Sequence, residues 1–272
     1  MEDFNHQAVI EKAFLASWET INLSSGWQSA GKTAKISCDN VDQIEWRHVG
    51  IASQNGHKLQ SKEGRNTASS YSSITVPLGS VSATKSGDVG VRGPFSRGGS
   101  SAGRKAFRIS ATLNANMEMV ANLLRDVNSV ANWNKALQAT RIVKRLDPDM
   151  VITYQLTAAN GNLLFPRDFV FGVKYGMMDN CFVAGGCSVD YPALPQEGDL
   201  VRAWNYPGCM VVRPIPGQAD VCLFQWLLDC DYGGWMPQSL FEFVVPFSQV
   251  MLVDSMAKEL GRIKKEQVLL SL

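Results

Sequence analysis

Seven strand-like runs follow one another in the second half of the chain, and this succession constrains the fold more than any other feature. Short turn-forming segments separate most of them, such as Asp147-Pro148-Asp149. Short turns join antiparallel neighbours, whereas parallel neighbours need a crossover of a dozen or more residues. The pattern therefore predicts a long antiparallel meander built from residues 137–146, 150–157, 168–177, 180–188, 200–204, 209–214 and 221–230.

Helical and strand-like segments precede this meander. Residues 6–21 place Val9, Phe14 and Trp18 near helical spacing, so we expect a helix there. Residues 43–52 have strand character, and the turn at Asn55-Gly56 predicts a hairpin into residues 57–61. The run KAFRISATL, residues 105–113, alternates apolar and polar side chains, as a half-buried strand does. A helix follows over residues 115–127, with Asn114 or Asn116 as its N-cap, and then a helical turn through Val130 and Trp133.

The segment from residue 62 to residue 104 has a different composition. Gly and Ser dominate it, and its apolar residues are isolated. Such a segment buries too little apolar surface to offset the entropy lost on ordering, which predicts a disordered insertion. We therefore expect residues 1–272 to form a single domain interrupted by this insertion.

The last predicted element is a long helix over residues 237–266, with Pro237 near its first position and Arg262, Lys264 and Lys265 in its last turns. Its apolar stripe is wide, so the sheet, a ligand or both must cover it. Pro246 removes one backbone hydrogen bond from its interior, at a cost of about 3 kcal/mol. Two interpretations follow: the first half of the helix moves as a lid, or the helix has a fixed bend over a curved sheet.

Composition limits the classes of function. The formal charge of +1 argues against nucleic acid as the main partner, and the 45% hydrophobic content suffices for a substantial core. The acidic N-terminus lacks the apolar region of a secretory signal, and no run approaches the ~20 apolar residues that span a bilayer. We expect a cytoplasmic monomer whose six cysteines are buried free thiols.

Residues suited to catalysis are scarce. The three histidines, His6, His48 and His57, all precede the meander, so a serine or cysteine nucleophile there would lack a histidine base. Two short segments match the consensus sequence of a known motif: GWQSAGKT matches that of the phosphate-binding loop, and GSSAG matches that of the nucleophile elbow. Neither has the strand–turn–helix context that its motif needs. We therefore expect no enzymatic activity, no catalytic residue, no metal and no cofactor.

Several stretches resemble the START domain, the family of StAR-related lipid-transfer domains. They are WNKALQATRIVKRL, GNLLFPRDFV, VAGG, LVRAWNYPGCMVVRPIPG, LFQWLLDCDYGGWMPQSL and the terminal helix, and they cover residues 133–265. The resemblance implies an α+β helix-grip fold, in which a curled antiparallel sheet surrounds a lipid tunnel and a long C-terminal helix closes it. The Ser/Gly-rich insertion is not part of the family pattern.

Arg167 and Asp168 stand directly after Pro166, at the start of an apolar strand. Such a pair either contacts a ligand or holds the strand in place. By the resemblance its role is structural, so we expect both residues to pair with neighbouring backbone groups or charges. We expect Arg202 and Arg213, which flank other strands, to face solvent, which leaves no arginine inside the tunnel.

The sterol-binding branch of the family places an acidic residue and an arginine opposite each other in the tunnel. The corresponding positions are Gln155, or Tyr154 in a different alignment, and Val173, so both charges are absent. Adjacent strand residues point to opposite faces, so only one of Tyr154 and Gln155 should face the tunnel. The predicted ligand-binding residues are Tyr154, Gln155, Val173, Val183, Gly185, Asn205, Gln225, Phe241, Val245, Leu252 and Met256.

The sequence and the resemblance together predict a non-enzymatic intracellular carrier. Its ligand would be one sterol or other neutral lipid, and it would touch a membrane surface transiently. The lid would comprise residues 191–198, residues 214–218 and the front of the last helix. These loops, with Trp235 and Met236 nearby, would also touch the membrane. The alternatives are a phospholipid carrier, a lipid-sensing regulator that uses the basic, serine-rich insertion, and, with less support, a small-molecule enzyme on the same fold.

Overall fold

The computed structural model of the chain describes residues 2–29, 41–48, 105–158, 166–198, 200–234 and 236–271. The predicted hairpin at Asn55-Gly56 and the segment 62–104 lie outside the described residues. The elements are α1 (Glu2–Ile21), β1 (Gln28–Ser29), β2 (Val41–His48), β3 (Lys105–Leu113), α2 (Met117–Arg125), the 3-10 turn η2 (Val127–Ser129), α3 (Val130–Trp133), β4 (Leu137–Asp147), β5 (Met150–Thr157), β6 (Arg167–Met178), β7 (Cys181–Ser188), β8 (Val201–Arg202), β9 (Trp204–Asn205), β10 (Gly208–Ile215), β11 (Gln218–Leu228), β12 (Cys230–Asp231) and α4 (Gln238–Leu270).

One large curled sheet forms the centre of the fold, in the order β1-β2-β3-β11-β10-β7-β6-β5-β4. Its neighbours are antiparallel, so the predicted antiparallel architecture is confirmed. The run expected at residues 200–204 is instead split: β8 pairs with β6 in parallel, and β9 pairs with β12 in a second, two-stranded sheet. Between β3 and β4 the chain crosses to the opposite edge of the sheet through α2 and α3.

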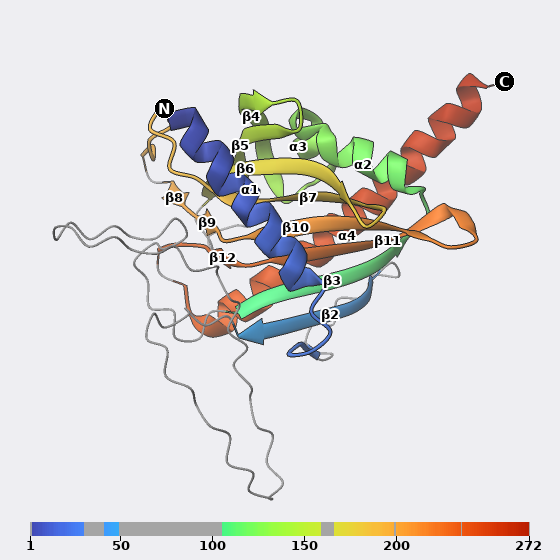
Figure 1. The fold of residues 1–272 in the computed structure, drawn as a ribbon, viewed down its shortest axis with the longest axis horizontal. Helices are drawn as coiled ribbons and strands as arrows, with labels where there is room; N and C mark the ends of the chain where they lie inside the picture. The colour runs from blue at the N-terminus through green and yellow to red at the C-terminus, as the bar shows by residue number, and fades with distance from the viewer. Residues whose placement is uncertain are drawn as a thin grey trace, which may run out of the picture.

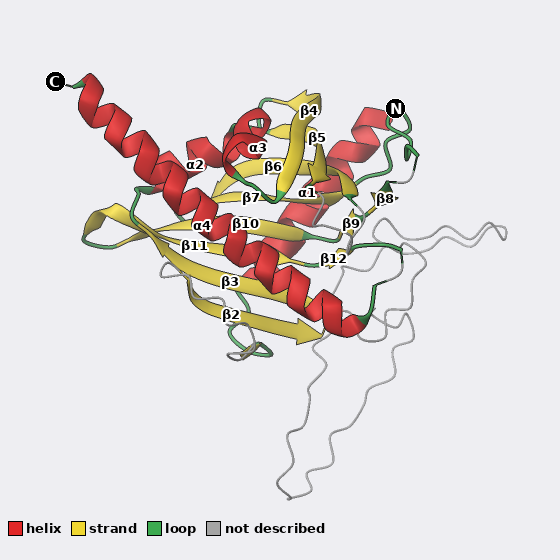
Figure 2. Ribbon diagram, turned by 180° about the vertical axis from the view of Figure 1, so that it is seen from behind, coloured by secondary structure: helices red, strands yellow, loops and turns green. Residues whose placement is uncertain are grey.

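Helices cover both faces of this sheet. Figures 1 and 2, which view the molecule from opposite sides, show α1 across one face and α4 across the other. Along β3, the side chains of Phe107, Ile109 and Leu113 face the cores beneath α4, whereas Ala106 faces the core beneath α1. Both faces of the sheet therefore carry apolar cores where the two helices cover them.

Glycines allow α1 to lie close to the sheet. A Cβ atom at Gly172 of β6 would come within 2.1 Å of the Ile10 Cδ1 atom. A Cβ at Gly185 of β7 would lie 3.0 Å from the Ser17 Oγ atom. The Ile10 side chain of α1 therefore packs directly on the backbone of β6 at Gly172, in space that a side chain there would occupy.

Helix α4 begins one residue after Pro237, which is its N-cap rather than its first helical residue, and runs without interruption across Pro246 to Leu270. The predicted end at residue 266 is wrong by one turn, so the last turn of α4 contains no basic residue. The helix is not broken at Pro246 in this structure. On α2, the alternative N-caps are resolved in favour of Asn116, whose side chain accepts a 2.8 Å hydrogen bond from the Met119 amide.

The apolar character of α4 corrects the expectation that no segment is apolar enough to span a bilayer. By length and composition, the segment Ser239–Leu270 could cross a membrane, and 44% of its most apolar window is buried. A core helix under a sheet meets the same criterion, and Val245, Val253 and Met256 of α4 are completely buried. The expectation for cysteines is confirmed within the described part of the chain, where Cys181, Cys187, Cys209, Cys222 and Cys230 are buried free thiols. Cys38 lies outside it.

Candidate functional site

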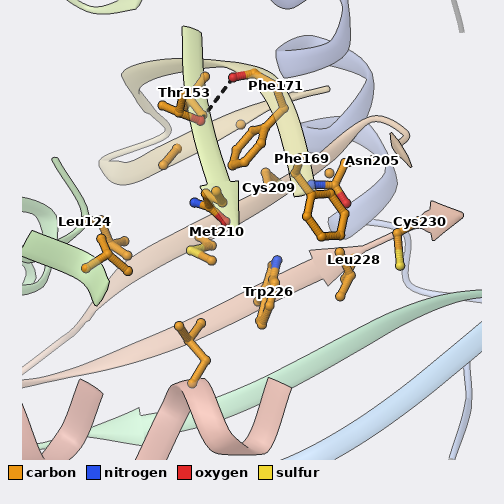
Figure 3. Close-up of a pocket in the computed structure, with 18 of the residues that line it drawn as sticks. Leu124, Thr153, Phe169, Phe171, Asn205, Cys209, Met210, Trp226, Leu228 and Cys230 are labelled. Carbon is orange, nitrogen blue, oxygen red and sulfur yellow. Dashed lines mark hydrogen bonds between the residues drawn. The ribbon is translucent and has the colours of Figure 1, made fainter. Parts of the chain in front are cut away.

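A cavity of about 220 Å³ lies between the concave face of the sheet and the helices α2, α3 and α4. A single water needs only ~10–15 Å³, so the space suits a much larger occupant. Strands β4 to β7 and β9 to β12 supply most of its wall, and Figure 3 shows several of the side chains that project into it. From α4, Ser248 and Leu252 complete the wall.

The wall of this cavity is uncharged. None of the described residues that line it is Asp, Glu, Lys, Arg or His. Most are aliphatic, aromatic or small, such as Val173, Trp226 and Ala184. An ionised ligand group placed here would lose its hydration without gaining a counter-charge, which is costly. The cavity therefore suits an apolar, electrically neutral molecule.

A few neutral polar groups interrupt this apolar wall. The Thr153 hydroxyl donates a 3.1 Å hydrogen bond to the Phe171 carbonyl, drawn as the dashed line in Figure 3. The Thr157 hydroxyl accepts a 2.9 Å bond from the Arg167 amide. Both hydroxyl groups therefore already take part in a hydrogen bond within the protein. Gln155, Asn205, Tyr232 and Ser248 supply further polar atoms.

Five predicted ligand-binding residues meet at this cavity: Gln155, Val173, Gly185, Asn205 and Leu252. Of the alternatives Tyr154 and Gln155, it is Gln155 that faces inward. Gly185 contributes backbone only, because a side chain there would point towards α1. Whether these five residues contact a ligand stays a prediction.

Three other predicted residues lie on the opposite face of the sheet. Tyr154 packs beneath Arg141, with the guanidinium carbon 5.1 Å from the ring centroid. Val183 is fully buried in the core beneath α1. Gln225 accepts a 2.8 Å hydrogen bond from Arg213 and donates a 3.2 Å bond to Ser110. An error of one residue reverses the face of a strand side chain, and the inward neighbours are Gln155, Ala184 and Trp226.

The remaining predictions concern α4. Phe241, Val245 and Met256 are not among the residues that line the cavity. Phe241 and Val245 pack in the core around Phe107, and Met256 is fully buried in the main core. Helical spacing identified the apolar stripe of α4, but the stripe is longer than the cavity, and only its middle reaches the wall. Ser248 and Tyr232, which the sequence reasoning missed, contribute polar atoms there.

Arg167 and Asp168 are structural, as predicted. Asp168 is 1% exposed and accepts two hydrogen bonds from Arg202, Nε to Oδ1 at 2.9 Å and Nη2 to Oδ2 at 2.8 Å. Arg167 donates from Nε to the Tyr232 carbonyl at 3.4 Å, and burial lowers the pKa of its guanidinium below the ordinary value. The pair anchors the start of β6 to β8 and to the chain after β12.

The structure corrects the expectation that Arg202 faces solvent. Its side chain is 12% exposed and also donates to the Leu194 and Pro195 carbonyls. It therefore holds the 191–198 loop against β6. Neither this loop nor residues 214–218 lines the cavity, so the structure does not place them as its cover. Arg213 lies on the α1 face, where it bonds Gln225 and Asn22.

Protonation keeps the buried titratable groups of the wall neutral. Burial raises the pKa of Cys187 to about 12, that of Cys209 to about 12 and that of Tyr175 to about 12. The thiols therefore stay protonated near neutral pH, whereas a nucleophilic cysteine needs the thiolate. The Cys209 thiol packs in the core beneath α1, next to Ser17, so it does not face the cavity.

A largely apolar cavity between a curled antiparallel sheet and a long C-terminal helix is suited to binding a hydrophobic molecule. The START domain family model matches residues 84–266, and the chain belongs to this family. The fold agrees: human StAR-related lipid transfer protein 5 covers 93% of this chain and 97% of its own length at a TM-score of 0.65, with 15% identity. A STAR-related lipid transfer protein from Xanthomonas axonopodis covers 87% of this chain and 99% of its own, with a TM-score of 0.56 and 18% identity.

Curated relatives include steroidogenic acute regulatory proteins, which are named as mitochondrial. The protein from Ovis aries is 30% identical over 158 residues, which are 57% of this chain and 55% of the relative. The protein from Gallus gallus is 29% identical over 160 residues, 58% of this chain and 57% of the relative. The matching region spans about half the length of these relatives.

Proposed function

We propose that the protein binds one neutral lipid, of the sterol class or of similar size, and transfers it between membranes without altering it. The observation that supports this most strongly is the absence of charge among the described residues of the cavity wall. Each methylene group moved out of water contributes roughly 0.8 kcal/mol, so an apolar wall alone retains a lipid. A phospholipid would need compensation for its phosphate, and the wall offers none.

Membership of the START family and the steroidogenic acute regulatory relatives support lipid transfer over the alternatives. Gln155 and Val173 both line the cavity, and both are neutral. By the resemblance, they occupy the positions of the charged pair in the sterol-binding branch. A single buried charge would be costly, so loss of both charges is consistent with a neutral ligand. The cytoplasmic location and the monomeric state remain proposals.

Native mass spectrometry, with extraction of the bound lipid, tests this proposal on protein purified from a eukaryotic host. We expect one neutral lipid per chain, and uptake of that lipid from phosphatidylcholine vesicles. An empty protein that takes up neither cholesterol nor any other neutral lipid from such vesicles would contradict the proposal. Uptake of phosphatidylcholine itself at one-to-one stoichiometry would favour the phospholipid alternative.

Transfer also requires contact with a membrane, and the first half of α4 offers a suitable surface. Between residues 238 and 253 it carries a single charged residue, Glu242. Phe243 is 51% exposed and stacks on Phe247 with ring centroids 5.7 Å apart. An exposed phenylalanine stacked on a half-buried one, on a helix segment with a single charge, is suited to the boundary between lipid headgroups and acyl chains. We propose that these two rings touch the membrane during exchange.

Replacing both rings, Phe243→Gln with Phe247→Gln, is expected to slow sterol transfer between vesicles by at least about 10-fold. Burial of one such side chain contributes roughly 1.5–3 kcal/mol, so its loss weakens the membrane encounter accordingly. Affinity for the bound lipid should change little, because neither ring lines the cavity. Vesicle flotation and a fluorescent-sterol transfer assay measure both effects. Leu15→Gln on α1, which removes an apolar side chain that is 47% exposed, is the control; an equal loss there would contradict the assignment to α4.

A further inference from the structure

The first two turns of α4, residues 238–245, cover one end of the cavity. Leu228 and Tyr232 line the cavity at this end, and Figure 3 shows Leu228 far from Leu124, which lies at the other end. Phe241 and Val245 of α4 belong to the same apolar core cluster as Leu228 and Tyr232. The Tyr232 and Phe241 rings meet edge-on, with centroids 6.1 Å apart at 76°. These two turns therefore stand directly behind the cavity wall.

The backbone is less constrained on both sides of these turns. Pro246 has no amide hydrogen, so it cannot give the Glu242 carbonyl, four residues earlier, the usual helical hydrogen bond. On the other side, the N-cap Pro237 makes no side-chain hydrogen bond to the first turn. Gly233 and Gly234, which precede it, have φ angles of 62° and 64°. Residues 238–245 can therefore move with less loss of backbone bonding than the rest of α4.

An ionic contact and an aromatic contact hold these turns against β3. The Lys105 Nζ atom donates a 2.8 Å hydrogen bond to the Glu242 Oε1 atom. The same ammonium lies 3.9 Å from the centroid of the Trp46 ring on β2. The Phe241 ring lies 6.1 Å from the Phe107 ring, which is two residues beyond Lys105 on β3. Glu242 thus joins the start of the helix to the β2–β3 edge of the sheet.

The ion pair lies next to the rings that we propose touch the membrane. Glu242 directly precedes Phe243, and its side chain is 38% exposed, whereas that of Lys105 is 14% exposed. A lysine ammonium binds phosphate oxygens as well as carboxylate oxygens. Anionic lipids attract basic groups to a membrane surface. Lipid phosphates that reach Phe243 therefore compete with Glu242 for Lys105.

We propose that the Lys105–Glu242 ion pair is a latch that keeps residues 238–245 closed in solution, and that lipid phosphates of an anionic membrane open it by binding Lys105. Movement of these two turns opens the end of the cavity at Leu228 and Tyr232, which makes this end the portal for lipid exchange. The inference rests on the proposed function, because it assigns a route and a control to the same transfer.

Glu242→Gln tests the latch, because it removes the charge while keeping nearly the same shape. A partly exposed ion pair changes an equilibrium by up to about 5-fold, so we expect sterol transfer between phosphatidylcholine vesicles to become about 3-fold faster. Asp254→Asn is the matched control, since it makes the same charge change on the same helix and breaks the exposed pair with Lys258. It should leave the rate unchanged. Lipid affinity should be retained in both variants, because neither residue lines the cavity.

Phosphatidylserine vesicles test the role of Lys105. We expect phosphatidylserine in the vesicles to speed transfer by the wild-type chain and by Asp254→Asn about 3-fold. Lys105→Gln also breaks the latch, so it should be fast on phosphatidylcholine alone. It should gain little from phosphatidylserine, because the ammonium that binds the phosphate is gone. A gain as large as that of the wild-type chain would overturn the assignment to Lys105.

Hydrogen exchange in solution tests the latch without any lipid transfer. Amides of residues 239–245 should exchange about 3-fold faster in Glu242→Gln than in the wild-type chain or Asp254→Asn, while those of residues 249–260 stay unchanged. Equal exchange in the three chains, or equal transfer rates for Glu242→Gln and Asp254→Asn, would overturn the latch and leave the lipid carrier standing. A wild-type chain that transfers no sterol would overturn the proposed function for sterols, and the exchange comparison would still decide the latch.

Discussion

Replacing Asp168 with alanine is expected to lower the free energy of unfolding by about 3–5 kcal/mol, because it leaves a largely buried arginine without its counter-charge. Asp168 is 1% exposed, and both of its carboxylate oxygens accept from Arg202. The loss is larger than for an exposed pair, since water cannot replace the carboxylate around the guanidinium. At roughly 2–4 °C per kcal/mol for a chain of this size, the melting temperature should fall by about 10 °C.

Urea denaturation followed by circular dichroism measures this loss. The control is Asp254→Ala on α4, which breaks an exposed ion pair with Lys258 at 2.6 Å. Exposed pairs contribute about 0–1 kcal/mol, so this variant should unfold almost as the wild-type chain does. Similar losses in the two variants would show that the Asp168–Arg202 pair does not hold the start of β6. Lipid uptake at a temperature where both variants are folded should be retained, because neither residue lines the cavity.

Local sequence signals predicted the elements well. The strands 105–113 and 150–157 have the predicted bounds, and the N-cap of α2 is one of the two asparagines proposed. These features depend on side-chain alternation and on capping, which act over a few residues. The structural role of Arg167 and Asp168 followed from the family resemblance, and the hydrogen bonds confirm it.

The face of each strand could not be read from the sequence, and the reason is the double covering of the sheet. Where one face of a sheet is exposed to solvent, polar and apolar residues alternate along each strand, and the apolar ones identify the buried face. Here α1 covers one face and α4 the other, so Leu227 is buried under α1 while Phe224 is buried under α4. Val183 and Ala184 are then equally plausible as cavity residues. Gln225 could be tolerated beneath α1 because Arg213 and Ser110 satisfy its amide.

The sequence pattern also could not predict the long-range pairing of β8 with β6. The parallel contact of β8 with β6 depends on the ion pair of Arg202 with Asp168, residues 34 positions apart. The pattern of short turns favours antiparallel neighbours and gives no sign of this contact. The prediction that Arg202 faces solvent is therefore wrong.

Substitutions at two neighbouring residues of β7 should separate effects on lipid affinity from effects on the free energy of unfolding. Ala184→Phe places a ring in the cavity of about 220 Å³, where it competes with the ligand for space. Overpacking of this kind typically costs about 1–3 kcal/mol, so lipid affinity should fall roughly 10- to 100-fold. The free energy of unfolding of the lipid-free chain should stay near the wild-type value, because the ring enters space that is otherwise empty.

Val183→Ala is expected to lower stability without weakening lipid binding. Val183 is fully buried beneath α1, so losing two methyl groups should lower the free energy of unfolding by about 1–3 kcal/mol. Lipid affinity should remain within about 2-fold of wild type, since the side chain points away from the cavity. Vesicle uptake and urea denaturation of the two variants measure both quantities. If Val183→Ala impaired uptake while Ala184→Phe did not, the inward face of β7 would be the other one, and the cavity would not be the lipid site.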